Sequence, residues 1–452
     1  MTFKSIYPYT QEIIAEYPLM NEGTISRCIA LAEKAFPVWS KMSFAERAKV
    51  FSTLSSLLKK RKETLGTLIT NEMGKVIAES IAEVEKCAYV CDYYVEHAEQ
   101  FLKDEMHEAG YKKSFVAYEP IGAVLGIMPW NFPFWQVFRY AAPTLMAGNV
   151  TLLKHAGNVS GCAKAIEQLF LDAGAPKAVF QSLIIQSTSV EKILSANIIQ
   201  AATLTGSEKA GSSVASIAGK NIKKTVLELG GSDPLIVLPD ADMKKAAATA
   251  LQSRMQNAGQ SCIGAKRFIV LKNALNDFMQ EVNHLVKNFV QGDPFDTAIK
   301  TGPMARIDLV EALQKQLNES IASGAHLVFG GDADGCNFKP AILVDVKKGM
   351  PAFEEETFGP LATVIIAKDE EDAIQLANDS ELGLGGSIWT ADIDKGITLA
   401  RKIKSGAVFI NSLVKSDPRL PFGGIKKSGY GRELGRHGIL EFVNAKTIAA
   451  DI

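Results

Sequence analysis

The sequence predicts an α/β protein built on two mainly parallel sheets. From about residue 121, short apolar runs bounded by Gly and Pro alternate with segments of helical pattern. Parallel strands need crossover connections, which are usually helices, so this alternation favours sheets covered on both faces. A second series of such runs begins after about residue 231 and predicts a second sheet of the same kind. The chain of 452 residues, 47% apolar and 22% charged, has the length and composition of a globular protein with several domains.

The first hundred residues, which precede the sheets, have the pattern of helices. Apolar side chains recur at helical spacing over residues 25–36, with Thr24 as the expected N-cap. Ser43 and Glu46 fit a capping box ahead of a second apolar stripe over residues 51–68. We therefore expect a helical layer in front of the first sheet.

Charge, cysteine content and the amino terminus exclude several classes of protein. The 49 Lys and Arg residues balance 50 Asp and Glu, so no global field favours nucleic acid or an anionic membrane. No segment has the pattern of a signal peptide or of an 18-residue membrane span. The six cysteines form no CxxC pair, and Cys87 and Cys91 lack a second pair of metal ligands nearby. We expect a cytoplasmic protein without a metal, nucleic-acid or membrane partner.

Gly206, Ser207 and Gly211 lie where an apolar run ends and a helical segment begins. A glycine turn at a helix N-terminus offers free backbone N–H groups and the positive end of the helix dipole, which suits a pyrophosphate. The spacing differs from GxGxxG, so this motif alone favours an ordinary strand-to-helix turn over a dinucleotide site.

Three further residues are candidates for acyl chemistry. Cys262 lies on a loop before the run RFIVL, where a thiol is accessible and its own amide can face a developing oxyanion; the alternative is a buried small residue. Glu228 is a lone carboxylate within an apolar run. Either a structural ion pair or a role as a base, with a pKa raised toward neutral pH, would explain it. Asn131 follows a predicted strand and could donate a second hydrogen bond to an oxyanion.

Seven motifs occur in a fixed order along the chain: PWNFPFWQ at 129–136, LLKHA at 152–156, LTGSEKAG at 204–211, LELGGSDP at 227–234, GQSC at 259–262, EETFGP at 355–360 and PFGGIKKSGYGRE at 421–433. Their order and spacing resemble those of the aldehyde dehydrogenase superfamily, and the chain is most similar to the short bacterial succinate-semialdehyde dehydrogenases. The resemblance covers nearly the whole chain and implies two Rossmann-like domains and a small β arm for oligomerisation.

The resemblance also implies a division of the chain into three parts. Residues 1–107 and 121–230 would form the dinucleotide-binding domain, and residues 231–430 the catalytic domain. Residues 108–120 and 438–452 would form the arm, which pairs subunits in the family. A homodimer is the first expectation and a homotetramer the second.

The reaction that the resemblance implies is the NAD(P)-dependent oxidation of succinic semialdehyde to succinate. Cys262 would be the nucleophile, Glu228 the general base, and Asn131 would hold the oxyanion together with the Cys262 amide. A low-pKa Cys262 would also be open to sulfenic oxidation. The alternatives are an enzyme for glutaric semialdehyde or a broad range of aldehydes and, from another class, a non-catalytic member of the family.

The cofactor site implied by the resemblance surrounds the first sheet. NAD-preferring members often carry a Glu three residues after the lysine of LLKHA, and this chain has Gly157 there, so we expect NADP as cofactor, with NAD as a second one. The expected cofactor residues are Trp130, Lys154, Gly157, Gly206, Ser207, Gly211, Glu356 and Phe358.

The substrate carboxylate requires a local positive site. Arg139 matches an arginine that clamps the carboxylate in the family, and a guanidinium suits a carboxylate bidentately. Some members have a second arginine where this chain has Gln256, so Ser416 or its neighbours Lys415 and Arg419 would complete the clamp. The expected substrate residues are Arg139, Trp135 and Ser416, with Trp135 limiting the length of the alkyl segment.

Overall fold

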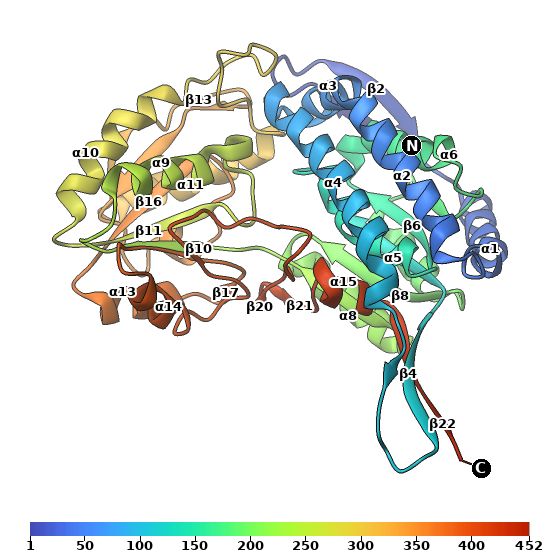
Figure 1. Ribbon diagram of the computed structural model, residues 1–452. Helices are drawn as coiled ribbons and strands as arrows, with labels where there is room; N and C mark the ends of the chain where they lie inside the picture. The colour runs from blue at the N-terminus through green and yellow to red at the C-terminus, as the bar shows by residue number, and fades with distance from the viewer. Residues whose placement is uncertain (452) are drawn as a thin grey trace.

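The computed structural model describes residues 1–451 and contains two sheets of mainly parallel strands, each flanked by helices (Figure 1). This arrangement confirms the predicted fold class. A narrow arm of antiparallel strands projects away from both halves, and the C-terminus lies at its tip. No helix within residues 1–451 is long and apolar enough to cross a membrane.

The first sheet has the strand order β21-β9-β8-β5-β6-β7, and only β21 runs antiparallel to its neighbour. The chain moves outward from β5 through β6 to β7 and then returns to the other side of β5 with β8. A crevice is expected where the direction of winding reverses, outside the carboxyl ends of β5 and β8. The strands are β5 (Ala123–Met128), β6 (Val150–His155), β7 (Phe180–Ser182), β8 (Ile199–Thr205), β9 (Lys224–Glu228) and β21 (Gly429–Tyr430).

Helices cover both faces of this sheet and form the expected layer before it. Asn21, not Thr24, is the N-cap of the first helix, because the Asn21 side chain accepts a hydrogen bond from the Thr24 N–H at 2.8 Å. The predicted Ser43–Glu46 capping box is confirmed. The helices are α1 (Glu22–Trp39), α2 (Phe44–Lys60), α3 (Lys62–Met73), α4 (Ile77–Phe101), α5 (Trp135–Met146), α6 (Ser160–Asp172), α7 (Val190–Leu194), α8 (Glu208–Lys220) and α15 (Gly435–Leu440), with the short 3₁₀ turns η1 (Gly157–Val159) and η2 (Ser187–Ser189).

The second sheet has the order β12-β15-β16-β11-β10-β18-β19, with only the β12–β15 pair antiparallel. Its strands are β10 (Asp233–Val237), β11 (Ala265–Leu271), β12 (His326–Phe329), β15 (Ala341–Val344), β16 (Leu361–Ala367), β18 (Ser387–Trp389) and β19 (Phe409–Ile410). Its helices are α9 (Met243–Met255), α10 (Leu275–Leu285), α11 (Ile307–Ala322), α12 (Pro351–Glu354), α13 (Glu370–Asn378) and α14 (Ile393–Ala400), with the 3₁₀ turns η3 (Gln256–Gly259) and η4 (Val286–Asn288).

The arm is a three-stranded antiparallel sheet of order β22-β4-β3. β22 (Val443–Ala450) pairs along its whole length with β4 (Lys113–Pro120), and β3 (Glu105–Met106) adds a short outer strand. Most of β22 is exposed. Three small two-stranded sheets complete the fold: β1 (Thr2–Ile6) with β2 (Ile13–Pro18), β13 (Ala333–Asp334) with β14 (Asn337–Phe338), and β17 (Leu382–Gly383) with β20 (Ile425–Lys426).

Candidate active site

Cys262 lies between two cavities and contributes to the wall of both. The first, of about 240 Å³, lies at the carboxyl ends of β5 and β8, and we call it the switch-point cavity. The second, of about 210 Å³, lies between α4, α5 and the loop over residues 413–416, and we call it the α4–α5 cavity. A thiol at this junction can meet one ligand from each side.

The loop that carries Cys262 is held in a strained conformation by the half-buried Glu79 and the buried Lys266. Asn257, Ala258 and Gly259 all have positive φ angles of 54°, 50° and 71°, a backbone region that is costly for non-glycine residues. The Asn257 N–H donates a 2.9 Å hydrogen bond to the Glu79 carboxylate of α4. Lys266 Nζ donates to the carbonyl oxygens of Ser261 and Cys262 at 2.8 and 2.9 Å. These contacts fix the nucleophile loop against both halves of the molecule.

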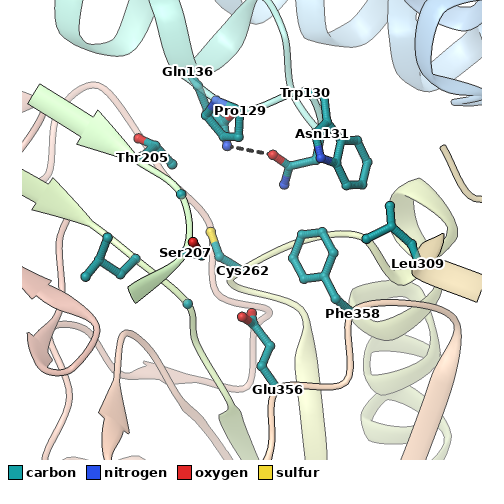
Figure 2. Close-up of a pocket in the computed structure, with 13 residues that line it drawn as sticks. Pro129, Trp130, Asn131, Gln136, Thr205, Ser207, Cys262, Leu309, Glu356 and Phe358 are labelled. Carbon is teal, nitrogen blue, oxygen red and sulfur yellow. Dashed lines mark hydrogen bonds between the residues drawn. The ribbon is translucent and has the colours of Figure 1, made fainter. Parts of the chain in front are cut away.

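The Asn131 amide is oriented toward the cavity that Cys262 lines. Its oxygen accepts a 3.0 Å hydrogen bond from Gln136 (Figure 2). Its Nδ2 donates to the Gln260 carbonyl at 3.0 Å. An amide nitrogen has two hydrogens, so one remains for an oxyanion at the Cys262 side of the cavity. The structure thus brings Asn131 and Cys262 together in the switch-point cavity.

The environment of the Cys262 thiol favours its neutral form. Burial raises its pKa to about 11, although the positive charges of Arg139 and Lys266 act in the opposite direction. The expectation of a low pKa, and with it of easy sulfenic oxidation, is therefore wrong for the ligand-free protein. A thiol in this state must lose its proton as the reaction begins.

Glu228 ends β9 and is the one of the three acyl-chemistry candidates that lies in neither cavity. Its carboxyl faces Gly423, where an added Cβ would lie 2.6 Å from Glu228 Oε1. Neither carboxyl oxygen has a hydrogen-bond partner within residues 1–451. Burial and the neighbouring Glu433 raise the pKa of Glu228 well above its usual value, which favours the neutral form of this carboxyl.

The turn after β8 forms one wall of the switch-point cavity. Ser207 is the N-cap of α8, and its hydroxyl accepts a 3.3 Å hydrogen bond from the Ala210 N–H. A Cβ on Gly206 would meet only Leu204, at 3.5 Å, which leaves the backbone of this turn open. A Cβ on Gly211 would lie 2.7 Å from Leu229, so Gly211 serves close packing of α8 on the sheet.

The opposite wall combines two aromatic rings with a carboxylate. Trp130 and Phe358 are in edge contact, with ring centroids 5.9 Å apart. Glu356 accepts a 3.1 Å hydrogen bond from the Gly231 N–H and pairs with Lys266 at 3.1 Å. Figure 2 shows the Glu356 carboxylate and the Cys262 sulfur directed into the same space. An apolar slot beside a fixed carboxylate suits a flat ring attached to a sugar.

Lys154 and Gly157 lie apart from this cavity, at the end of β6 and in the turn that follows it. Lys154 is half-buried, and burial lowers its pKa. A Cβ on Gly157 would lie 2.7 Å from the Phe3 ring of β1. Phe3 of the amino-terminal hairpin therefore occupies the space that a side chain at position 157 would need.

The three predicted substrate residues all line the α4–α5 cavity. Arg139 is buried and forms an ion pair with Glu433, and its Nη2 donates to Thr205 at 3.2 Å. The charge of Arg139 is thus already balanced, and only some of the five N–H donors of its guanidinium remain for a ligand. The Trp135 indole N–H donates to the Ser416 hydroxyl at 2.9 Å.

The other two cations considered for the clamp lie outside it. Arg419 forms two hydrogen bonds to Asp417, at 2.8 and 2.7 Å, and is exposed. Lys415 lies on the rim of the cavity and is exposed as well. Neither is placed to hold a carboxylate deep in the cavity.

Sequence reasoning missed four residues that shape the site. Gln136 lines both cavities, and only its position in the motif PWNFPFWQ, five residues after Asn131, could have indicated this from the sequence. The other three act through contacts between distant segments, which no local pattern reveals: Glu79, Lys86 and Lys266.

Comparison with known proteins agrees with the motifs. The model of the aldehyde dehydrogenase family matches residues 1–448. The chain is 47% identical to a probable NADP⁺-dependent succinate-semialdehyde dehydrogenase of Synechocystis sp., over 99% of both chains. It is 43% identical to the NAD(P)⁺ enzyme Sad of Escherichia coli, over 99% of this chain and 97% of the relative. The crystal structure of succinic semialdehyde dehydrogenase from Streptococcus pyogenes with NADP⁺ matches all of both chains, with a TM-score of 0.97 and 35% identity. With its motifs, its fold and these relatives in agreement, the chain belongs to the aldehyde dehydrogenase family.

Proposed function

We propose that this protein oxidises succinic semialdehyde to succinate with NADP⁺ as the preferred cofactor. The observation that carries the proposal is the position of Cys262, which separates the switch-point cavity from the α4–α5 cavity. An aldehyde on one side and a nicotinamide on the other can then meet at the same sulfur. The names of the similar proteins support this choice of substrate and cofactor.

The residues of the switch-point cavity fit a dinucleotide. The open turn at Gly206 and the N-terminus of the 13-residue α8 suit a pyrophosphate, and Glu356 suits ribose hydroxyls. Trp130 and Phe358 would enclose the nicotinamide ring. The bound cofactor would supply a hydride acceptor on its side of Cys262.

The first chemical step would join Cys262 to the substrate. The thiol releases its proton to solvent, as one of the two protons produced overall, and the sulfur attacks the aldehyde carbon to give a tetrahedral thiohemiacetal with a negative oxygen. The free hydrogen of the Asn131 amide and the Cys262 N–H would hold this oxygen. Loss of a hydride from the same carbon then gives a thioester on Cys262.

The second step would release the acid by hydrolysis. Glu228 would act as the base that takes a proton from water, which then attacks the thioester carbon and restores Cys262. Overall, one aldehyde, one water and one oxidised cofactor give one carboxylate, one reduced cofactor and two protons. Because the Glu228 carboxyl faces Gly423 in the ligand-free protein, it must turn toward the cavities to act.

The preference for NADP⁺ rests on the turn after β6. A 2′-phosphate on the adenosine ribose would meet the half-buried Lys154 and no carboxylate at Gly157. The test is a comparison of kcat/KM for both cofactors across a panel of semialdehydes of increasing chain length. A higher kcat/KM with NAD⁺ would contradict the cofactor assignment, and a maximum at glutaric semialdehyde or at uncharged aldehydes would contradict the substrate assignment.

We also propose that the arm joins two copies of the chain in a homodimer, or two such dimers in a homotetramer. The long, exposed β22 has a backbone edge that is unpaired within residues 1–451, and such an edge favours pairing with another strand. We keep the three-part division of the chain as a proposal: the two sheets and the arm support it, with β3 added to the arm and β21 to the first sheet. The six cysteines are all free thiols, which supports a location in the reducing cytoplasm.

A further inference from the structure

Lys86 of α4 is a half-buried cation in the wall of the α4–α5 cavity. Its Nζ lies 4.0 Å from the centre of the Trp135 ring and donates a 2.9 Å hydrogen bond to the Ser416 hydroxyl. Both neighbours line the same cavity as Cys262. The ammonium group is therefore fixed inside the space where an aldehyde would approach the nucleophile.

Lys86 has no carboxylate to balance its charge. No Asp or Glu oxygen within residues 1–451 lies closer than 4.0 Å to its Nζ, so no ion pair offsets the partial burial of this charge. Three nearby cations are each paired with a carboxylate: Lys75 with Glu83, Arg139 with Glu433, and Arg419 with Asp417. Lys415, on the exposed rim of the cavity, forms no ion pair within residues 1–451 either, but it lies in contact with solvent.

The hydrogen bonds around Ser416 supply a second donor beside this charge. Its oxygen accepts from both the Trp135 indole and Lys86, each at 2.9 Å. A hydroxyl oxygen has two lone pairs, so both are in use and the Ser416 hydrogen must point elsewhere. One O–H and the remaining N–H groups of an ammonium are then available for an anion, and a carboxylate with two oxygens can use both.

We propose that Lys86, together with the Ser416 hydroxyl, binds the distal carboxylate of the substrate and is the residue that makes the enzyme selective for a semialdehyde acid. This inference rests on the proposed function. It replaces the expectation that Lys415 or Arg419 completes the clamp in place of the arginine missing at Gln256. Arg139 remains in the wall as a second, already paired cation.

The charges that face Lys86 make its binding dependent on pH. Burial and the charge of Arg139 on α5 lower the Lys86 pKa to about 8, while Cys87 and Glu83 on its own helix and Asp417 on the adjacent loop oppose this shift. A lysine with a lowered pKa is charged below that pH and neutral above it. In the free enzyme, attraction for a carboxylate should therefore weaken as the pH rises through about 8.

The test compares succinic semialdehyde with butanal, which has the same number of carbons and no charge. Lys86→Met removes the charge and keeps most of the volume. We expect it to lower kcat/KM for succinic semialdehyde by about 10- to 100-fold, through KM, and to change kcat/KM for butanal by less than about threefold. Lys415→Met is the matched control, because it removes one positive charge from the exposed rim, and it should lower kcat/KM for succinic semialdehyde by no more than about threefold.

The ratio of the two kcat/KM values against pH gives a second readout. Ionisation of Cys262 affects both substrates and cancels in the ratio. In the wild-type protein the ratio should fall above about pH 8, whereas in Lys86→Arg it should not fall above that pH because a guanidinium remains charged. Glu79, which lines the same cavity and has a pKa of about 7, changes its charge below this range in both proteins. In Lys86→Met the ratio should be low at every pH.

The outcomes separate the two proposals. A wild-type protein that oxidises butanal as well as succinic semialdehyde would overturn the proposed substrate, and the role of Lys86 with it. A selective wild-type protein whose Lys86→Met variant loses both activities equally, or keeps its selectivity, would overturn the role of Lys86 alone. Far-ultraviolet circular dichroism and NADP⁺ binding by the variant show that it is folded.

Discussion

The two cavities that meet at Cys262 are built from different parts of the chain. One wall of the switch-point cavity consists of strand ends and the turn before α8 and so follows from the backbone of the first sheet, while Trp130, Glu356 and Phe358 form the opposite wall. The α4–α5 cavity is lined by long side chains from two helices and a loop, several of them charged. The first shape therefore depends in part on the fold, whereas the second depends mainly on individual side chains. Cofactor binding should therefore tolerate changes in the α4–α5 cavity, and substrate choice should not.

The two cavities also differ in how each holds a carboxylate. In the switch-point cavity, Glu356 is held by Lys266 and the Gly231 N–H. In the α4–α5 cavity, Glu79 accepts a hydrogen bond from the Asn257 N–H, and burial raises its pKa to about 7. A half-buried carboxyl with a raised pKa therefore supports the nucleophile loop, and we expect the substrate side to respond more to pH than the cofactor side.

The largest expected effect comes from removing the group that both cavities share. Cys262→Ala should lower kcat by at least roughly 10⁴-fold, because no other nucleophile lies at the junction. The walls of the switch-point cavity remain, so NADP⁺ should bind within about threefold of its wild-type Kd. Steady-state kinetics and cofactor titration check both statements. Retention of more than a hundredth of the activity would remove Cys262 from the role of nucleophile.

Next in size is the effect of Glu228, which lies in neither cavity. Glu228→Gln should lower kcat by about 10²- to 10³-fold while leaving one rapid turnover of hydride transfer, because only thioester hydrolysis needs the base. Rapid mixing should then show a burst of reduced cofactor equal to the enzyme concentration, followed by a slow phase.

The pH dependence of the same step follows from the raised pKa of Glu228. A carboxyl with a raised pKa becomes a base only at higher pH, so thioester hydrolysis in the wild-type protein should speed up as the pH rises. The slow phase of Glu228→Gln should lose this dependence. A variant with no burst, or with unchanged kcat, would show that another group activates the water.

The residues that sequence motifs could identify are those in the turns and strand ends. Cys262 and Asn131 each lie within a short motif and also meet in the switch-point cavity. Lys86 and Glu79 could not be found in this way, because their partners lie 330 and 178 residues away. On α4 alone, both resemble ordinary charged residues of a helix surface. The low pKa expected for Cys262 was wrong for a related reason: burial raises the pKa of this thiol, and the segments that bury it come together only in the folded protein.

The smallest effect tests the cofactor side at the turn after β6. Gly157→Glu should lower kcat/KM for NADP⁺ by about 10-fold relative to NAD⁺, because a carboxylate there repels a 2′-phosphate. Any side chain at this position must also displace the Phe3 ring, 2.7 Å from the position of its Cβ. Gly157→Gln is the matched control: it has the same size without the charge, so it should lower kcat/KM with both cofactors equally. If Gly157→Gln changes the cofactor preference as much as Gly157→Glu does, packing against Phe3 governs the preference and charge repulsion does not. Neither variant should alter the ratio of succinic semialdehyde to butanal oxidation, because position 157 lies outside the α4–α5 cavity.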